Sequence, residues 1–475
     1  MSDPQNILVE YTDPENYSYF TREFPKKKKK KGYLRNSVLV ILAFCSAFFS
    51  RLLDSFGAPS VINFAHFFMI PYACIITLTK TGTKDPHQIY VIKLLITTIM
   101  IFFGVLCAST LWNDAGIING ILSFLLLAEP FIMILTIVSL SLSRERFQRF
   151  RLWLTSFLIF HIFLAQFQKY ILKVDNWHHI GMEPQDRIQG VFFVSGAGHV
   201  VGASVSLTFG LYYLFCAKEA PLWLRVLVMA TAFWQIMIAD AKQVLMAFMA
   251  AAILLLLTKF KSVGEALKYI IGGTLLGYTF LWCVENVPAF KAYTVWASPE
   301  LYGPEGDATI LKTTAFRVIP THYTSWVNWW LGLGPGHTVG RLGGWMLREY
   351  QSLLAPLGAT MHPASSDVWT VTASFYIASR SSLFSPLFGW AGIWGDLGFL
   401  GLGAYLLMSA VVWHYICFDD FSKFLMLTVL VFGLIFTQME EPGYMLSIAT
   451  IIALRWHDHR HQLKTEKSLN SISPP

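Results

Sequence analysis

The sequence predicts an all-α polytopic membrane protein with about 12 transmembrane helices and one large extracytoplasmic loop. Three observations predict this fold class. Of the 475 residues, 55% are hydrophobic and only 14% are charged, whereas an ordinary soluble domain carries about 25% charged residues. Apolar segments of about 20 residues recur along the chain, close to the length that a helix needs to cross a hydrocarbon core about 30 Å thick. Aromatic residues reach 15%, which suits a surface that faces lipid tails and headgroups.

Residues 1–35 form a polar segment that ends in a run of positive charge. Six consecutive lysines, Lys26 to Lys31, stand directly before the first apolar segment. That apolar segment is long and has no small-residue cleavage site after it, so we do not expect a cleavable signal peptide. We expect residues 1–35 to be a cytoplasmic basic tail that fixes the orientation of the first helix.

Twelve apolar segments follow this tail, in two groups. Because backbone amides cannot remain unpaired in lipid, each segment should be helical. Residues 36–284 hold the first nine predicted transmembrane helices and residues 389–454 hold the last three, of which the final two are short and could form one re-entrant hairpin. The segments are 36–53, 60–79, 89–111, 117–142, 152–172, 188–216, 223–239, 243–258, 266–284, 389–417, 423–438 and 443–454.

Positive charge alternates along the connections between these segments. Starting from a cytoplasmic lysine run, every second connection is rich in Lys or Arg, as the positive-inside rule requires. Both termini, including the tail at residues 455–475, are therefore expected in the cytoplasm. The residues that mark the predicted cytoplasmic connections are Lys80, Lys84, Lys93, Arg144, Arg146, Arg149, Arg151, Lys218, Arg225, Lys259, Lys261, Lys268, Arg455 and Arg460.

Residues 285–388 form the one long connection, and the alternation places it outside the cytoplasm. Its eight prolines and several glycines predict an irregular structure with short helices near the membrane surface. Its Trp and Tyr residues favour a position at the membrane interface. No internal repeat is visible in the chain, so the inverted-repeat pattern of many transporters is not evident.

The partners expected from composition are membrane lipids and not nucleic acid. The formal net charge is +7, but the positive residues are clustered in short segments between apolar stretches. All six cysteines fall within or at the ends of apolar stretches, so we expect no disulfide framework and no metal–thiolate site.

Three of the cations on the predicted outer side stand out against the inward bias of positive charge: Arg187, Lys242 and Arg317. A cation near an outer helix end is suited to bind a phosphate or diphosphate at headgroup level, because the anion offsets the desolvation of the cation. Each could instead extend to lipid headgroups or pair with a nearby acid, as Lys242 would with Asp240. If they bind one diphosphate, the three should converge beside a cleft that opens to lipid.

Several motifs, taken in order, resemble the O-antigen ligase and O-antigen polymerase superfamily of membrane glycosyltransferases. They are RIQGVFFVSGAGHVVGASVSL, the ADAK turn before an apolar helix, RVIPTHYTSWVNWWLGLGPG and GIWGDLGFLGLGAYLLM. The resemblance covers roughly residues 150–440, and its motifs are loose. It implies a GT-C-like fold in the bacterial inner membrane, with transfer of glycan from an undecaprenyl-diphosphate-linked oligosaccharide to a glycan or lipid acceptor. It implies no cofactor and no metal.

The resemblance also implies roles for individual residues. Arg187 and Arg317 match two arginines of the family that bind diphosphate, with the glycines that follow Arg317 forming a turn. Lys242 stands where the family usually has Ser-x-Arg, so the charge is kept and bidentate phosphate binding is lost. The turn glycines are Gly332, Gly334 and Gly336.

The sequence leaves the catalytic base open. The family has a histidine in the large loop shortly before its glycine-rich final helices, and His362 is the nearest candidate, although it lies 36 residues ahead of Gly398. A base must accept the proton of the acceptor hydroxyl. His362 is the first choice and Asp367 the second, followed by His322, His337, Glu440 and Glu441. His161 and His199, inside predicted helices, are interpreted as neutral histidines bonded to a neighbouring helix.

Two alternatives to a glycosyltransferase remain. One is a transporter or flippase for a lipid-linked or anionic solute, although the middle of the predicted helices carries few charges. The other is a non-catalytic membrane scaffold. Convergence of polar residues near the membrane midplane would favour the transporter, and convergence at the outer interface would favour the enzyme.

Overall fold

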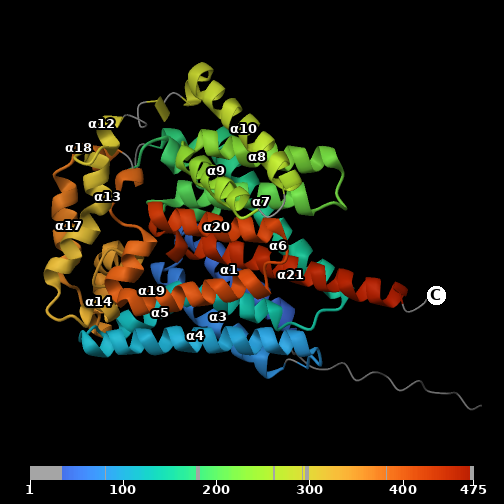
Figure 1. The fold of residues 1–475 in the computed structure, drawn as a ribbon, viewed down its shortest axis with the longest axis horizontal. Helices are drawn as coiled ribbons and strands as arrows, with labels where there is room; N and C mark the ends of the chain where they lie inside the picture. The colour runs from blue at the N-terminus through green and yellow to red at the C-terminus, as the bar shows by residue number, and fades with distance from the viewer. Residues whose placement is uncertain are drawn as a thin grey trace, which may run out of the picture. The chain divides into compact units, whose positions relative to one another are not determined.

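The structure is a computed structural model that describes residues 35–80, 82–177, 182–259, 263–290, 293–294, 299–380 and 382–470. Every regular element in these ranges is helical, as predicted (Figure 1). Six of the helices in these described ranges are long and apolar enough to cross a membrane, so the chain is an all-α protein of the membrane-embedded kind. They are Ser60–Thr79, which joins η1 (Ser60–Phe64) to α3 (Ala65–Thr79), α4 (Pro86–Trp112), α5 (Ile117–Val138), α6 (Arg144–Tyr170), α7 (Gly198–Cys216) and α19 (Gly389–Tyr415).

The remaining predicted segments also contain helices, but they do not all reach spanning length. Among them α1, α8 and α9 are apolar and have 17 residues or fewer. The count of 12 crossings therefore stays a prediction. The helices are α1 (Asn36–Phe48) with the short α2 (Ser50–Ser55), α8 (Leu222–Ile238), α9 (Lys242–Leu257), α10 (Val263–Asn286), α20 (Asp420–Ile435) and α21 (Pro442–Asn470).

The prediction of a helix over 188–216 is wrong in its first third. The helix α7 begins only at Gly198, and residues before it form the short 3-10 helices η3 (Gln185–Arg187) and η4 (Gly190–Phe192). Gly190 has a positive φ of 59° and lies so close to the His161 ring that a Cβ would come within 2.4 Å of it. The side chain of Gln168 binds the N–H groups of Gln189 and Gly190, so this side chain takes the place of helical hydrogen bonds.

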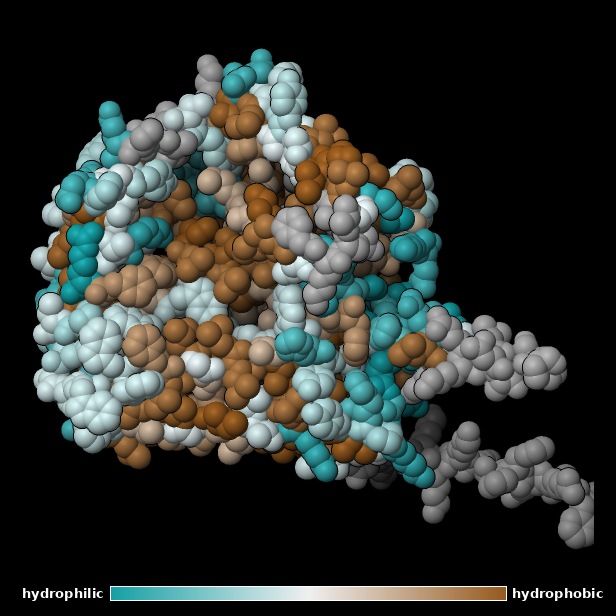
Figure 2. All heavy atoms as spheres, viewed as in Figure 1, coloured by the Kyte–Doolittle hydropathy of each residue, from teal (hydrophilic) through white to brown (hydrophobic). Residues whose placement is uncertain are grey.

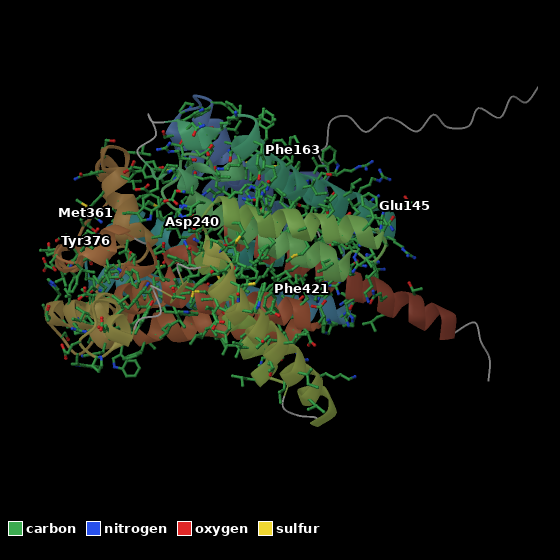
Figure 3. All side chains as sticks on the ribbon, turned by 90° about the horizontal axis from the view of Figure 1, so that it is seen from above. Glu145, Phe163, Asp240, Met361, Tyr376 and Phe421 are labelled. Atoms are coloured by element: carbon green, nitrogen blue, oxygen red, sulfur yellow. The ribbon has the colours of Figure 1, made fainter. Side chains whose placement is uncertain are left out.

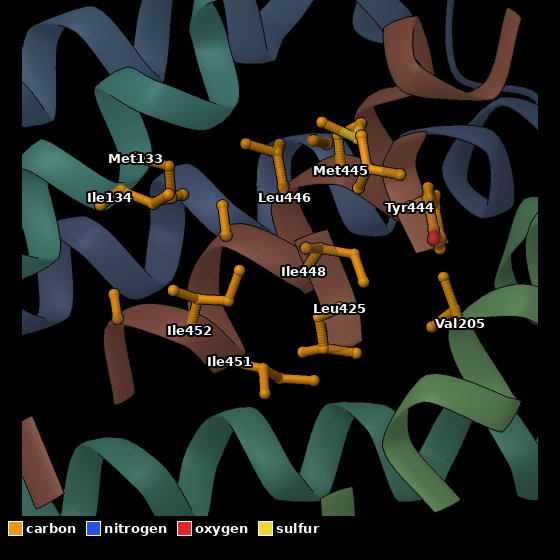
Figure 4. Close-up of a cluster of buried hydrophobic side chains, with 14 of the residues drawn as sticks. Met133, Ile134, Val205, Leu425, Tyr444, Met445, Leu446, Ile448, Ile451 and Ile452 are labelled. Atoms are coloured by element: carbon orange, nitrogen blue, oxygen red, sulfur yellow. The ribbon is translucent and has the colours of Figure 1, made fainter. Parts of the chain in front are cut away.

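The centre of the packed helices is α21, which contacts α5, α7 and α20. Figure 4 shows Ile448 and Ile452 of α21 among Met133, Val205 and Leu425, all of which are at least nine-tenths buried. Lipid is as apolar as these side chains, so close packing rather than water exclusion stabilises the contact. Many other large apolar side chains remain exposed on the long helices, and Figure 2 shows a hydrophobic surface over them. Such a surface is expected where lipid surrounds the protein.

The connections predicted to be cytoplasmic lie together at one end of the long helices. Five ion pairs between the described residues join them across the sequence, and in Figure 3 Glu145 lies at the end opposite to Met361 and Tyr376. The alternation of charge predicted that these connections share one side, although they are far apart in the sequence. The pairs are Arg151 with Glu219 at 2.6 Å, Arg151 with Asp458 at 3.5 Å, Arg455 with Asp419 at 2.5 Å, Lys259 with Asp420, and Arg460 with Asp85.

Short helices of residues 285–388 gather at the other end (Figure 1). This agrees in kind with the short helices expected there. Their position outside a membrane stays a prediction. The elements are η5 (Pro288–Phe290), α12 (Pro299–Tyr302), α13 (Asp307–Val318), η6 (Ile319–His322), α14 (Asn328–Leu331), the π-helix η7 (Leu342–Met346), α15 (Leu347–Glu349), α16 (Gln351–Leu354), η8 (Ala355–Leu357), α17 (Pro363–Ala373), α18 (Tyr376–Arg380) and η9 (Ser382–Phe384); η10 (Thr437–Glu440) precedes α21.

This segment is packed into the ends of the long helices and is not a separate domain. Leu342 and Met346 of η7 are buried against Phe67 of α3 and Leu126 of α5. Lys312 of α13 donates to the carbonyls of Ser385, at 2.9 Å, and Ile435, at 2.7 Å. Because Ile435 ends α20, this lysine ties α13 to the C-terminal end of a long helix, where a cation is favourable.

Candidate functional site

The predicted glycine turn is present, and it surrounds a buried carboxylate that the sequence did not indicate. Gly332, Gly334 and Gly336 have φ values of 69°, 105° and 73°, a region that only glycine adopts readily. The Asp396 side chain, 5% exposed, accepts hydrogen bonds from the N–H of Gly336 at 2.8 Å, the N–H of Thr338 at 2.8 Å and the Thr338 hydroxyl at 2.6 Å. The anion that this turn binds is therefore the Asp396 carboxylate of the protein itself.

A break in α19 makes room for this turn. Gly398, inside α19, has a φ of 64° and a ψ of −163°, which interrupts the helix. The N–H of Leu333 and of Gly334 then donate to the carbonyls of Gly395 and Asp396 at 2.8 and 3.0 Å. A Cβ on Gly398 would lie 2.3 Å from the Trp330 carbonyl carbon, so glycine is required at the break. This arrangement fixes the segment that continues from the turn to His337 and Arg341.

Four of the candidate bases meet beside the turn. The ring of His362 lies 5.4 Å from that of His322 and 5.3 Å from that of His337, centroid to centroid. His322 Nε2 is 3.0 Å from a carboxylate oxygen of Asp367. His362 and Asp367, which were predicted from the sequence as first and second choice, thus belong to one group with His322 and His337. We call these four residues the histidine cluster.

Within the histidine cluster, His362 is held in its neutral form. Burial, together with the neighbouring His337 and His322, lowers the pKa of His362 to about 4. The ring is therefore neutral at pH 7. Its Nδ1 accepts the N–H of Ala364 at 3.1 Å, so in the neutral ring Nε2 carries the hydrogen and can donate it. His337 is more restricted, since its two nitrogens lie 2.8 Å from the Leu333 carbonyl and 2.9 Å from the Thr360 hydroxyl.

A hollow next to the same segment contains two arginines that the sequence did not single out. It has about 280 Å³ of empty space, which includes open solvent at its mouth. Its polar lining comes from Arg51, Asn63, His66 and Arg341, and its aromatic lining includes Trp345 and Tyr350. We call it the arginine hollow. Arg51 lies at the outer end of the first predicted transmembrane segment, residues 36–53, and Arg341 stands four residues after His337 in the predicted outer loop.

Arg341 is buried with part of its hydrogen-bonding capacity unused. Its guanidinium pairs with Glu441 and lies 4.9 Å above the Trp345 ring, while Nε has no partner among the described residues. Burial, reinforced by the charge of Arg51, lowers the pKa of Arg341 to about 9. Burial likewise raises the pKa of Glu440, which accepts the N–H of Arg341, to about 8. A neutral Glu440 and unpaired donor atoms leave this hollow able to accept an anionic ligand.

A buried pair of side chains from α3 and α5, His66 and Glu129, lies beside the arginine hollow. His66 Nδ1 lies 2.7 Å from Glu129 Oε1, and both side chains are at most 5% exposed. The Asn63 side-chain NH₂ donates to Asp54 at 2.7 Å, and the side-chain oxygen Oδ1 of Asn63 is buried without a partner in the described part of the chain. A ligand hydroxyl is a suitable donor for this oxygen.

The predicted diphosphate residue Arg187 is already occupied by internal contacts. Its guanidinium is buried and donates to the Met182 carbonyl at 3.0 and 2.6 Å and to the Asp175 carbonyl at 2.8 Å. These bonds close the loop before α7. They leave few donors for a ligand unless the loop rearranges, so the predicted role of Arg187 is unsupported by its geometry.

Lys242 and Arg317 are placed differently from one another. Lys242 Nζ lies 2.5 Å from Asp240 Oδ1, the pairing considered as its alternative role. Arg317 is exposed on α13, where it donates to the Thr313 hydroxyl at 2.6 Å. Because α13 packs against α12, α17 and α19 whereas α9 packs against α20, Arg317 belongs to a different set of packed elements from Lys242. Binding of diphosphate by Arg187, Lys242 and Arg317 stays a prediction.

His161 is bonded to a neighbouring helix, as interpreted from the sequence. Its Nε2 lies 2.9 Å from the Gly202 carbonyl of α7, and its Nδ1 accepts the N–H of Val191 at 3.2 Å. His199 Nε2 lies 3.6 Å from a carboxylate oxygen of Asp186 in η3, and its buried Nδ1 has no hydrogen-bond partner among the described residues. Neither ring lines the arginine hollow.

Arg51, Arg341, His66 and Asp396 are the residues that sequence reasoning missed. One signal was available, because Arg51 and Arg341 are outer cations by the same charge alternation that singled out Arg317. In the described residues, no group of three or more His, Cys, Asp or Glu side chains is arranged to hold a metal ion. No protein-family model matches the chain, and no curated protein matches it.

Proposed function

We propose that this protein is a membrane glycosyltransferase of the O-antigen ligase or polymerase type. It transfers or polymerises glycan from an undecaprenyl-diphosphate-linked donor at the periplasmic face of the bacterial inner membrane, in O-antigen or exopolysaccharide biosynthesis. One observation carries the proposal: the arginine hollow combines two arginines with aromatic rings, and the segment that lines it also bears the histidine cluster. Arginine suits phosphate, and aromatic faces suit the apolar faces of sugars.

The reaction requires two groups that these residues supply. The acceptor hydroxyl attacks the anomeric carbon while the bond from that carbon to the phosphate oxygen breaks, and the lipid diphosphate leaves with the electron pair. Arg51 and Arg341 stabilise the negative charge that grows on the leaving group. The acceptor proton passes to Nδ1 of His362, which releases the N–H of Ala364 to accept it, and the Asp367 carboxylate stabilises the protonated state.

The same proposal assigns sides of the membrane. The 12 helices that match the apolar segments cross the bilayer, and both tails face the cytoplasm. Residues 285–388, with the exposed Trp326 and Trp330, lie at the outer interface, where tryptophan is favoured. Arg317 is exposed at this level and is available to a lipid headgroup.

A direct assay tests the assignment. The full chain in nanodiscs is given an undecaprenyl-diphosphate-linked oligosaccharide, and release of undecaprenyl diphosphate and growth of the glycan are measured together. We expect Arg341→Gln to lower the rate by about 100-fold, the effect typical of losing one preorganised donor to a developing charge. His362→Ala should lower it by a similar factor.

Two matched variants separate a catalytic effect from misfolding. Arg149→Gln removes an exposed arginine at the other end of the molecule, 3.8 Å from Glu145, and should retain full activity. Arg341→Lys keeps the charge and should recover part of the rate without the bidentate contact. Wild-type rates for Arg341→Gln and His362→Ala, in protein that folds normally, would refute this site.

One observation favours the second candidate, a transporter or flippase. The His66–Glu129 pair is buried between α3 and α5, and ionisable pairs inside membrane helices commonly serve transport. Transbilayer movement of a fluorescent undecaprenyl-diphosphate lipid in proteoliposomes, without glycan growth and lost in Glu129→Gln, would select this candidate over the enzyme.

A further inference from the structure

A second hollow lies at the end opposite to the arginine hollow, among the connections rich in Lys and Arg. It has about 620 Å³ of empty space. Thr83 before α4, Ser141 and Ser143 before α6, and Trp456 and Arg460 of α21 line it. We call it the α6 hollow. Three segments far apart in the sequence form it, and all five of these side chains can donate hydrogen bonds.

The start of α6 gives this hollow a positive end. The helix has 27 residues and begins at Arg144, and the Ser143 side chain at its N-cap makes no capping hydrogen bond. The first N–H groups of a helix lack partners within the helix and carry partial positive charge. Arg144 and Arg146 add full charges in the same turn, opposed there only by Glu145. Basic residues at a helix N-terminus are unfavourable, and a bound anion would relieve them.

An unpartnered buried donor on another helix points to the same ligand chemistry. The Trp456 side chain is 1% exposed, and its Nε1 has no hydrogen-bond partner among the described residues. The Arg460 guanidinium lies 4.8 Å above the Trp456 ring and pairs with Asp85. An indole N–H can only donate, so the group that satisfies it must be an acceptor.

We propose that the α6 hollow binds a phosphate group. Arg460, the Trp456 N–H, the Ser141 and Ser143 hydroxyls and the first N–H groups of α6 are its donors. The phosphate belongs either to the headgroup of an anionic lipid or to a free phosphorylated solute, since both present the same oxygens. This site is independent of the proposed glycosyltransferase reaction and lies on the predicted cytoplasmic side.

Thermal unfolding of the full chain in zwitterionic micelles tests the proposal. The probes are inorganic phosphate, short-chain phosphatidic acid and, as a neutral control, short-chain phosphatidylcholine. We expect phosphatidic acid to raise the unfolding temperature in a saturable way. Stabilisation by inorganic phosphate as well would identify a site for free phosphate, and stabilisation by phosphatidic acid alone would identify a site for a lipid headgroup.

Site-directed variants show whether phosphate binding depends on the residues of the α6 hollow. Arg460→Gln should weaken the apparent affinity by about tenfold, the loss expected for one charge-assisted hydrogen bond. Because Arg460 also pairs with Asp85, a Ser141→Ala, Ser143→Ala double variant gives a second measurement that leaves this ion pair intact. Arg149→Gln, on α6 but outside the hollow, should bind as wild type does.

Three results would overturn the proposal. The first is that neither phosphate probe stabilises the protein. The second is that phosphatidylcholine stabilises it as much as phosphatidic acid does. The third is that the Ser141/Ser143 double variant, with a far-ultraviolet circular dichroism spectrum that matches wild type, binds with unchanged affinity. None of these measurements uses glycan transfer, so a failure to bind phosphate leaves the proposed function untouched, and inactivity in the transfer assay leaves this site untouched.

Discussion

Replacing Asp396 with alanine should destabilise the protein strongly, because the carboxylate satisfies the glycine turn from inside. The variant leaves three donors without their acceptor: the N–H groups of Gly336 and Thr338 and the Thr338 hydroxyl. A buried donor left unpaired costs about 1–3 kcal/mol. The hydroxyl can rotate toward another acceptor, so counting the two N–H groups alone gives a loss of about 4 kcal/mol in the free energy of unfolding.

The loss is measured by denaturant unfolding of the detergent-solubilised chain, followed by tryptophan fluorescence. Asp396→Asn keeps one acceptor oxygen and places an NH₂ group against an N–H, so we expect roughly half of the loss. Glu145→Ala is the matched control, because its carboxylate is 84% exposed and its pairing with Arg149 is long, at 3.8 Å. If Asp396→Ala unfolds within about 1 kcal/mol of that control, the carboxylate does not hold the turn together and this reasoning is refuted.

Three further predictions follow from the same region. Gly334→Ala should lower the free energy of unfolding by about 1–3 kcal/mol in the same measurement, because the residue has a φ of 105° and a Cβ would lie 3.0 Å from the Ala115 side chain. An unchanged free energy of unfolding would show that alanine is not strained at this position. The folded-state pKa of His362 is about 4, below its ordinary 6.5, so between these pH values the unfolded chain binds more protons than the folded chain. The free energy of unfolding should therefore fall as the pH falls from 6.5 to 4, and it should fall less in His362→Gln. Burial lowers the pKa of Lys312 from 10.5 to about 7, so stability should rise with pH from 7 to 10.5, and Lys312→Met should remove that rise.

Much of the helical architecture was predictable because it depends on local composition. A stretch of about 20 apolar residues in lipid has few options other than a helix, and each of the 12 apolar segments contains one. The alternation of positive charge also predicted which connections share an end, as the Arg151–Glu219 and Arg460–Asp85 pairs show. The start of α7 was mispredicted, because Gln168 and His161 bind backbone groups that a helix would otherwise pair.

The candidate site was predictable only in part. The glycine turn and the pairing of Lys242 with Asp240 follow from short-range patterns, and His362 was singled out with Asp367. The meeting of His322, His337 and His362 was not predictable, since 40 positions separate the first from the last and their contact depends on how α17 packs against α13 and η6.

The sequence by itself determined that the chain is helical, apolar on its surface and divided by charge into two ends, because these properties come from neighbouring residues and from the surrounding lipid. Only the tertiary structure decided which polar groups are free for a ligand. Arg187 has the charge of a phosphate-binding residue, but backbone carbonyls already accept its hydrogen bonds. Arg341 keeps a buried Nε without a partner among the described residues, beside the arginine hollow. Charge is a property of the residue, whereas unused hydrogen-bonding capacity depends on every segment that packs around it.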